Sequence, residues 1–357
     1  MPARKGRGAV SNIEGRFEKR RIAPIEDGRP EGDEDDAPPR LTTTVIPEKT
    51  RTILARNDSP DISFDRSINP YKGCEHGCVY CFARPTHSYL GLSPGLDFET
   101  KIFSKPDAAR LLREELRRPG YRCEVIALGA NTDPYQPAER DLKITRSLLE
   151  VLQEHRHPVG IITKSSLVLR DLDLLAPMAE ERLASVFVSI TTLDRGLART
   201  MEPRAASPDR RLATLRALSD AGVQAGVLSS PMIPGLNDSE LERILEAAAG
   251  AGARSAGYVL LRLPHEVKQL FTEWLETHYP LKAKHVLSLV RETHGGRLYD
   301  SEFGTRMKGT GPYAELLRRR FETACRRYGL SRTPAPLDTG RFRVPPRAGD
   351  QPDLFGP

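Results

Sequence analysis

The chain has 357 residues, of which 38% are hydrophobic and 29% are charged, and its net charge is +6. This length predicts one large domain or two small ones, with enough apolar residues for a sizeable core. No apolar run approaches the roughly 18 residues of a membrane helix, which excludes a membrane-spanning protein. The basic opening lacks the apolar centre of a secretory signal, so we expect a cytoplasmic protein.

Residues 1–45 are predicted to form a disordered N-terminal arm. Basic residues are followed by an acidic run and a proline pair, and few aliphatic side chains are present that could form a core. The core domain is expected over residues 46–280.

The core domain alternates short apolar segments with helical segments. The segments predicted as strands are 67–71, 124–129, 159–163, 185–191, 225–229 and 257–262. Strands that are apolar on both faces and followed by helices are typical of parallel βα units. The chain is therefore predicted to have an α/β fold, a partial (β/α)6 TIM-like barrel whose active residues lie at the carboxyl ends of the strands.

Residues 281–331 are predicted to form a small C-terminal extension with a basic helix over residues 312–327. The arginines of this helix could bind the phosphates of a nucleic acid, or they could complement the dipole of a solvated helix end. Residues 332–357 are predicted to form a flexible tail rich in proline and arginine.

The last residues of the tail include a short segment with Gln351, Leu354 and Phe355. This segment resembles the peptides by which bacterial replication and repair proteins bind the sliding clamp, where a Leu-Phe pair fills an apolar groove. Matches of this length also arise by chance. The clamp is one candidate partner.

Three of the five cysteines, Cys74, Cys78 and Cys81, fall in one short stretch with the spacing C-x3-C-x2-C. The odd number and uneven spread of the cysteines argue against a disulfide framework. Three thiolates can hold an iron–sulfur cluster, which usually takes four, so one iron would keep an open position for a substrate or cofactor. The alternative is structural zinc, for which His76 or Cys123 would have to complete the site.

The cysteine motif, with Tyr80 before its third cysteine and βα units after it, resembles the signature of the radical S-adenosylmethionine (SAM) superfamily. The resemblance covers about residues 60–265. It implies that the three thiolates hold a [4Fe–4S] cluster and that SAM chelates the fourth iron. One electron then cleaves the sulfonium and yields a 5′-deoxyadenosyl radical for hydrogen abstraction. A reductant such as ferredoxin or flavodoxin would supply this electron.

Within the superfamily, the chain resembles spore photoproduct lyases and the DNA-repair-photolyase-like proteins grouped with them. The segments 69–74 and 130–134 carry this likeness, together with Lys164 and Ser189. The likeness implies that Tyr80 lies beside the adenine of SAM. It also implies that Lys164 and Ser189 contact the methionyl or ribose groups.

Charged residues after the fourth predicted strand, Glu202, Arg204 and Arg211, look like residues that such proteins use on the same cofactor. The alternative for Lys164, Glu202 and Arg204 is a surface ion pair. The residues Asn131, Asp133 and Glu139 are expected at the mouth of the second predicted strand, facing the cofactor or the substrate. Equally, they suit a turn and the first turn of a helix.

Two positions depart from the lyase pattern. Spore photoproduct lyase has a hydrogen-donating cysteine where this chain has Ala130, and a tyrosine where it has Phe82. The resemblance therefore predicts radical chemistry on an unidentified substrate other than the thymine dimer, with nucleic acid favoured. The second hypothesis is a metal-stabilised module that binds nucleic acid or the sliding clamp and performs no radical chemistry.

Overall fold

The computed structural model describes residues 6–17 and 41–346, and its main element is a seven-stranded sheet in the order β10-β9-β8-β7-β6-β3-β2. Neighbouring strands from β3 to β10 are parallel, whereas β2 pairs antiparallel with β3. These strands are β2 (Leu54–Arg56), β3 (Arg66–Ile68), β6 (Ile126–Leu128), β7 (Val159–Thr163), β8 (Ala184–Ser189), β9 (Gln224–Met232) and β10 (Ser255–Leu260).

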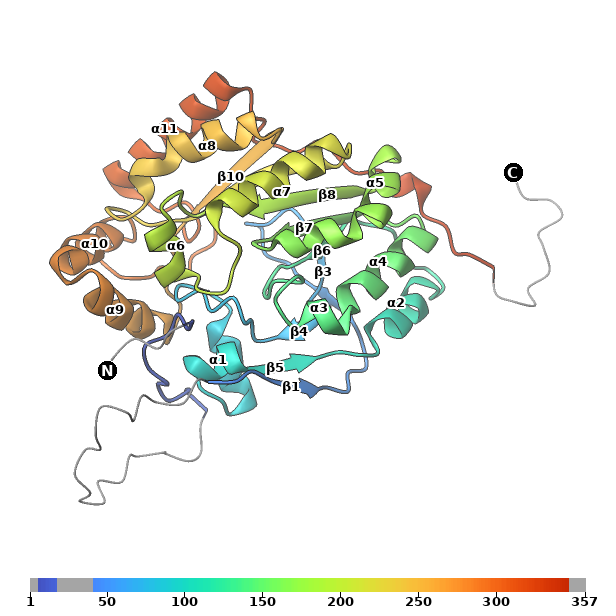
Figure 1. The fold of residues 1–357 in the computed structure, drawn as a ribbon, viewed down its shortest axis with the longest axis horizontal. Coiled ribbons are helices and arrows are strands. Elements are labelled where there is room, and N and C mark those ends of the chain that lie inside the picture. The colour runs from blue at the N-terminus through green and yellow to red at the C-terminus, as the bar shows by residue number, and fades with distance from the viewer. Residues whose placement is uncertain (1–5, 18–40, 347–357) are drawn as a thin grey trace, which may run out of the picture.

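Helices follow the parallel strands and cover the outer face of the sheet (Figure 1). The consecutive residues Ala184, Ser185 and Val186 are all buried, as expected for a strand that is covered on both faces. The predicted α/β fold of the partial-barrel type is therefore confirmed. The helices of this part are α2 (Ala108–Leu116), α3 (Glu139–Leu142), α4 (Ile144–Glu154), α5 (Leu172–Glu180), α6 (Arg195–Met201), α7 (Pro208–Asp220) and α8 (Leu241–Gly250). Short 3-10 helices are η1 (Arg84–Leu90), η2 (Ser166–Asp171) and η3 (Asp238–Glu240).

A second, smaller sheet lies beside the barrel and carries the cysteine stretch. Its order is β1-β5-β4, with β1 (Thr44–Pro47), β4 (Tyr71–Lys72) and β5 (Lys101–Ser104), and α1 (Leu96–Thr100) leads into β5. The chain leaves β4 directly into the cysteine motif. The sequence analysis did not predict this sheet, because its strands are short and lack a regular apolar pattern.

Part of the predicted disordered arm instead lies against the core domain. In residues 6–17, the amides of Gly8 and Ala9 donate to the two oxygens of the Glu99 carboxylate, at 3.0 and 2.8 Å. Arg7 donates to the backbone carbonyl of Glu99 at 2.9 Å. These are polar contacts to a residue about ninety positions away, so the scarcity of aliphatic side chains did not reveal them.

The C-terminal helices are α9 (Val267–His278), α10 (Pro280–Glu292) and α11 (Gly311–Tyr328), followed by η4 (Thr339–Arg341). Helix α11 packs against α8, and α9 packs against α10 (Figure 1). The first part of the predicted flexible tail is docked on the barrel, where the Phe342 ring lies 5.3 Å from Tyr121 and 5.4 Å from His157 between ring centroids.

Two expectations from the sequence concern a sliding-clamp partner and the absence of a membrane helix. The clamp-like segment with Gln351, Leu354 and Phe355 lies outside the described residues. None of the helices in the described ranges has the length and apolar character needed to cross a bilayer.

Candidate active site

A cavity of about 740 Å³ lies at the carboxyl ends of the parallel strands. Residues that end or follow successive strands line it: Asn131 after β6, Lys164 after β7, Ser189 at the end of β8, Pro231 in β9 and Arg262 after β10. Side chains from several strands therefore converge on one space, as in other barrels of parallel strands. A ligand in this cavity would contact most strands of the sheet.

All three cysteines of the motif, Cys74, Cys78 and Cys81, line this cavity. The loop that carries them turns sharply at Gly77, whose φ is +67°. A Cβ atom at this position would lie 2.8 Å from a carboxylate oxygen of Glu99, so only glycine fits without displacement. The sequence thus places three thiols on one wall of the cavity.

Two completely buried residues, Arg84 and Glu99, stabilise the cysteine loop. The Arg84 guanidinium donates to the carbonyls of Cys78 at 2.9 Å and Gly77 at 3.1 Å, and pairs with Glu99 at 2.5 Å. Loss of either charge would leave the other buried without its partner. The sequence analysis missed this support, because nothing in the local pattern distinguishes a buried arginine from an exposed one.

Burial has the largest effect on the pKa values of the Cys78 and Cys81 thiols. It raises the pKa of Cys78 to about 12 and that of Cys81 above its usual value, while the positive charge of Lys164 acts against both shifts. Thiols in such a setting lose their protons when they coordinate a metal. The donor chemistry therefore suits a metal centre.

Tyr80, between the second and third cysteines, joins a buried network around Glu202. Its hydroxyl donates to the Glu202 carboxylate, which also accepts from Thr191 at 2.7 Å and forms an ion pair with Arg211. Burial by itself would raise the pKa of Glu202, but the positive charges of Arg211 and Lys164 and the hydrogen bonds lower it to about 2. The carboxylate is thus ionised, and it fixes the Tyr80 ring against the cavity.

Asp133 forms a second carboxylate contact at the mouth of the barrel. It accepts hydrogen bonds from the Lys164 amide and the Thr163 hydroxyl, both at 2.7 Å, and lies 3.3 Å from Nδ1 of His76 in the cysteine loop. Burial opposes its ionisation, but His76 and these hydrogen bonds outweigh it and lower the pKa of Asp133 to about 2. Asp133 therefore links strand β7 to the cysteine loop.

The structure separates the eight predicted SAM contacts into two groups. Tyr80, Asn131, Asp133, Lys164 and Ser189 line the cavity, and the Lys164 ammonium lies 5.8 Å from the centre of the Tyr80 ring. The other three, Glu202, Arg204 and Arg211, lie behind its wall, as described next.

These three residues contact the cavity wall or the cysteine loop. Arg211 donates to the carbonyl of Ser189 at 3.0 Å in addition to pairing with Glu202. Arg204 pairs with Glu75 of the cysteine loop at 2.9 Å, and its side chain is 34% exposed. The alternative of a surface ion pair therefore describes Arg204, whereas it does not describe Glu202, whose side chain is fully buried.

The two positions that depart from the lyase pattern, Ala130 and Phe82, both line the cavity. Neither side chain carries a hydrogen on oxygen or sulfur. Cys123, the candidate fourth zinc ligand outside the motif, is not among the lining residues. Within the described ranges, no three His, Cys, Asp or Glu side chains gather as one metal ion requires. A cubane cluster requires a wider arrangement, since each thiolate binds a different iron.

The family model of the Radical SAM superfamily matches residues 68–248, about half of the chain. The chain belongs to the radical SAM superfamily. The match includes the cysteine motif and the strands from β4 to β9, and residues of this stretch form much of the cavity lining. The protein is a radical SAM enzyme.

Two relatives of this radical SAM enzyme come from two different organisms. An uncharacterized protein of Mycobacterium tuberculosis is 37% identical over 291 residues, which cover 80% of this chain and 82% of the relative. An uncharacterized protein of Methanocaldococcus jannaschii is 30% identical over 173 residues, which cover 48% of this chain and 62% of the relative. Neither name states an activity.

Solved structures of spore photoproduct lyase have the same fold. The complex with dinucleoside spore photoproduct superposes with a TM-score of 0.58 at 17% identity, covering 80% of this chain and 81% of the lyase. A lyase mutant with bound AdoMet and dinucleoside spore photoproduct gives the same score, identity and coverage. At this identity the likeness establishes the fold, as the sequence resemblance implied.

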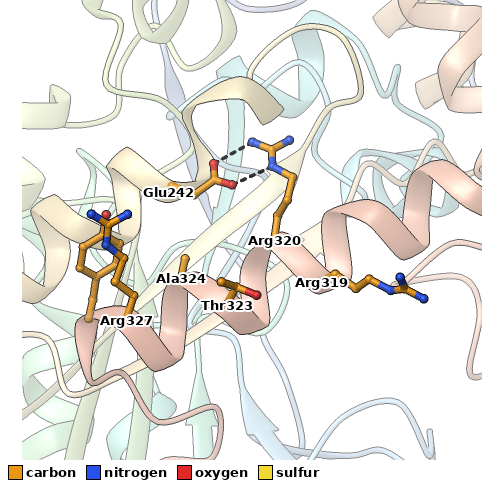
Figure 2. Close-up of a pocket in the computed structure, with 7 residues that line it drawn as sticks. Glu242, Arg319, Arg320, Thr323, Ala324 and Arg327 are labelled. Carbon is orange, nitrogen blue, oxygen red and sulfur yellow. Dashed lines mark hydrogen bonds and ion pairs between the residues drawn. The ribbon is translucent and has the colours of Figure 1, made fainter.

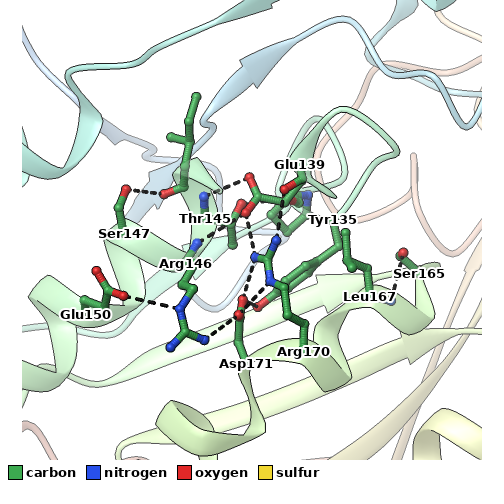
Figure 3. A network of polar contacts seen from close by, with 12 residues as sticks. Tyr135, Glu139, Thr145, Arg146, Ser147, Glu150, Ser165, Leu167, Arg170 and Asp171 are labelled. Carbon is green, nitrogen blue, oxygen red and sulfur yellow. Dashed lines mark hydrogen bonds and ion pairs between the residues drawn. The ribbon is translucent and has the colours of Figure 1, made fainter. Parts of the chain in front are cut away.

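A second buried network in this radical SAM enzyme lies away from the cavity and contains Glu139 (Figure 3). The Glu139 carboxylate accepts from the Tyr71 hydroxyl at 2.5 Å, from the Thr145 amide at 2.9 Å and from Arg170 at 2.7 Å. Asp171 accepts from Arg170 at 2.8 Å. Glu139 was expected to face the cofactor. It is instead bound by Tyr71, Thr145 and Arg170 and does not line the cavity.

The arginines of the predicted basic helix, now α11, are mostly neutralised by neighbouring acids. Arg318 pairs with Glu315 at 2.6 Å, and Arg320 pairs with Glu242 of α8 at 2.7 Å (Figure 2). Arg319 also pairs with Glu315, at 2.8 Å. Arg318 and Arg319 thus form ion pairs within α11, and Arg320 joins α11 to α8.

Proposed function

We propose that Cys74, Cys78 and Cys81 hold a [4Fe–4S] cluster in the cavity, with SAM chelated by the remaining iron. The observation that carries this proposal is that all three thiols line the same cavity as Tyr80 and Lys164. A cluster held there would supply the one-electron reduction of SAM, with the electron coming from a reductant such as ferredoxin or flavodoxin, to give methionine and a 5′-deoxyadenosyl radical that would abstract a hydrogen atom from the substrate.

The chain's own residues bind and orient the cofactor in this proposal. The Tyr80 ring lies beside the adenine, and Lys164 supplies the positive charge for the methionyl carboxylate, with Ser189 and Asn131 as hydrogen-bonding partners. Asp133 holds the backbone of Lys164 and the ring of His76 in place. These assignments use the cavity-lining residues among those that the sequence predicted.

The three predicted contacts behind the wall act as positioning residues. Arg211 and Glu202 fix the Tyr80 hydroxyl, and Arg204 holds Glu75 next to the first cysteine. A buried ion pair of this kind specifies geometry more than it adds stability. SAM therefore meets a preformed surface.

The substrate is proposed to differ from that of spore photoproduct lyase, although nucleic acid stays the favoured class. This proposal is supported by the shared fold of a spore photoproduct lyase that is complexed with dinucleoside spore photoproduct. The alanine and phenylalanine at positions 130 and 82 offer no hydrogen for return to a substrate radical. Any hydrogen that is returned would come from 5′-deoxyadenosine or from another group.

The proposal is tested by purifying the protein without oxygen and measuring its iron and sulfide. Dithionite and SAM are then added, and 5′-deoxyadenosine is measured by mass spectrometry. We expect about four irons per chain and formation of 5′-deoxyadenosine. Cys78→Ala is expected to lose both, whereas Cys123→Ala, outside the cavity, keeps both. Bound zinc without iron or sulfide would refute the proposal and favour the metal-stabilised binding module.

A further inference from the structure

Arg262 is a cavity-lining arginine without a polar partner. It follows strand β10, and within the described part of the chain its guanidinium makes no hydrogen bond or ion pair, while Nε is buried without any partner. Its guanidinium carbon lies 5.1 Å from the centre of the Phe82 ring. A buried donor without an acceptor costs free energy unless a ligand supplies that acceptor.

The nearby cation Arg306 shows what a structural arginine looks like in the same cavity. Arg306 pairs with Asp61 at 2.5 Å and donates to the Ser59 hydroxyl at 2.5 Å. Asp61 also accepts from the Gly304 amide at 2.6 Å, so its two oxygens are both engaged. The hydrogen bond from the Gly304 amide, followed by Arg306, holds the pKa of Asp61 below its usual value; the charge of Arg262 contributes least, and the two side chains form no ion pair.

The anion of SAM has a cation of its own in the proposed function. The methionyl carboxylate binds near Lys164, which follows β7, whereas Arg262 follows β10. Two strands, β8 and β9, lie between them in the sheet, which corresponds to about 14 Å between the two strand ends. Two cations therefore line the cavity from different strands, and Lys164 is the one assigned to SAM.

Resting on the proposed function, we infer that Arg262 binds an oxyanion of the substrate, a carboxylate or a phosphate. The planar fork of a guanidinium matches both groups by two parallel hydrogen bonds. The Phe82 side chain is 42% exposed and lies under the guanidinium. The substrate therefore has an apolar or planar part beside its anionic group.

The inference is tested by modifying the cluster-containing protein with phenylglyoxal, which reacts with accessible arginines, and mapping the modified peptides by mass spectrometry. The protectors are inorganic phosphate, thymidylyl-thymidine, succinate and SAM, each tested separately and without reductant. We expect Arg262 to react faster than the ion-paired Arg306. We also expect phosphate and the dinucleotide, or else succinate, to protect it, which identifies the anion as phosphate or carboxylate. Protection by none of them, or by SAM alone, would overturn the inference.

Variants at the same position separate charge from geometry. Arg262→Gln should weaken binding of the protecting anion about tenfold or more, as loss of a charge-assisted hydrogen-bond pair predicts. Arg262→Lys should lose less, because the ammonium keeps the charge without the fork. Iron content and the circular dichroism spectrum control for folding. If both variants bind the anion as tightly as the wild type does, Arg262 is not its site.

The two proposals fail in different ways. Protection of Arg262 does not require cleavage of SAM, so it can be measured in protein that forms no 5′-deoxyadenosine. Formation of 5′-deoxyadenosine without protection of Arg262 would refute only the anion site. Protection without 5′-deoxyadenosine would support the anion site and refute the radical reaction.

Discussion

The Glu202 and Glu139 carboxylates are both completely buried, and each accepts a hydrogen bond from a tyrosine and forms an ion pair with an arginine. They differ in what their tyrosines touch. Tyr80, bound to Glu202, lines the cavity with the cysteines, whereas Tyr71, bound to Glu139, does not. Burial and ion pairing are thus shared by a network that reaches the cavity and one that does not. Contact with the cavity distinguishes them.

The two arginines also differ in their access to water. The side chain of Arg211 is 2% exposed, whereas that of Arg170 is 21% exposed and also pairs with Asp171. Arg211 therefore depends on one carboxylate for its neutralisation, and Arg170 does not. We therefore expect loss of the carboxylate in the network beside the cavity to cost more unfolding free energy than the same change in the Glu139 network.

The largest difference is expected from the matched pair Glu202→Gln and Glu139→Gln. Glu202→Gln leaves Arg211 buried without a counter-charge and should cost about 3–5 kcal/mol of unfolding free energy. It should also weaken SAM binding, because Tyr80 loses its acceptor. Glu139→Gln should cost about 1–3 kcal/mol and leave SAM affinity unchanged. Urea unfolding and equilibrium dialysis of SAM measure the two effects. Equal losses of SAM affinity would remove the distinction between the networks.

The pH dependence of stability should separate wild type from Glu202→Gln. The folded-state pKa of Glu202 is lowered to about 2, so its ionised form stabilises the protein above its unfolded pKa. That contribution is lost as pH falls from about 4 towards 2, on the order of 3 kcal/mol for a shift of this size. Wild type should therefore lose more stability over this range than the variant in urea unfolding. Parallel curves would show that Glu202 carries no such contribution.

Lys164→Gln should affect binding without affecting the fold. Lys164 lines the cavity and makes no ion pair within the described residues, so its loss breaks no salt bridge. Removing the charge proposed to face the methionyl carboxylate should weaken SAM binding by about 1–2 kcal/mol. Unfolding free energy should change by about 1 kcal/mol or less, because the charge of Lys164 favours the ionised form of Glu202 without pairing with it. A loss of stability with unchanged SAM affinity would make Lys164 a structural residue.

The smallest effect on SAM affinity is expected from the matched hydroxyl deletions Tyr80→Phe and Tyr71→Phe. Each removes one hydrogen bond to a buried carboxylate and should cost about 1–3 kcal/mol of stability. Only Tyr80→Phe should also weaken SAM binding, by a few-fold, because its ring is no longer fixed against the cavity. Thermal unfolding and SAM dialysis report both. If Tyr71→Phe weakens SAM binding equally, the two networks act on the cavity together.

The sequence predicted the parallel strands and the cysteine wall well, because both depend on local patterns. Apolar runs mark buried strands, and the spacing of Cys74, Cys78 and Cys81 is visible in one short segment. The small sheet and the docking of Arg7 on Glu99 were not predictable in this way. They depend on polar contacts between residues far apart in the chain, which leave no periodic signal.

Individual site residues were predicted less well than the site. Lys164 and Ser189 came from the resemblance to spore photoproduct lyases, and both line the cavity in the structure. Glu139 and Glu202 look alike in the sequence, yet one belongs to the helices and the other to the cavity wall. Arg262 drew no attention because an arginine after a strand is ordinary until its partners are known.

The central claim is that SAM binds directly to an iron held by this cavity. Electron–nuclear double resonance of the reduced protein tests it, using SAM labelled with ¹⁷O in the carboxylate and ¹⁵N in the amine. The account predicts hyperfine coupling from both labels to the cluster in wild type, and no cluster signal in Cys78→Ala. A reduced cluster that shows no coupling to either label, with SAM bound, would contradict it.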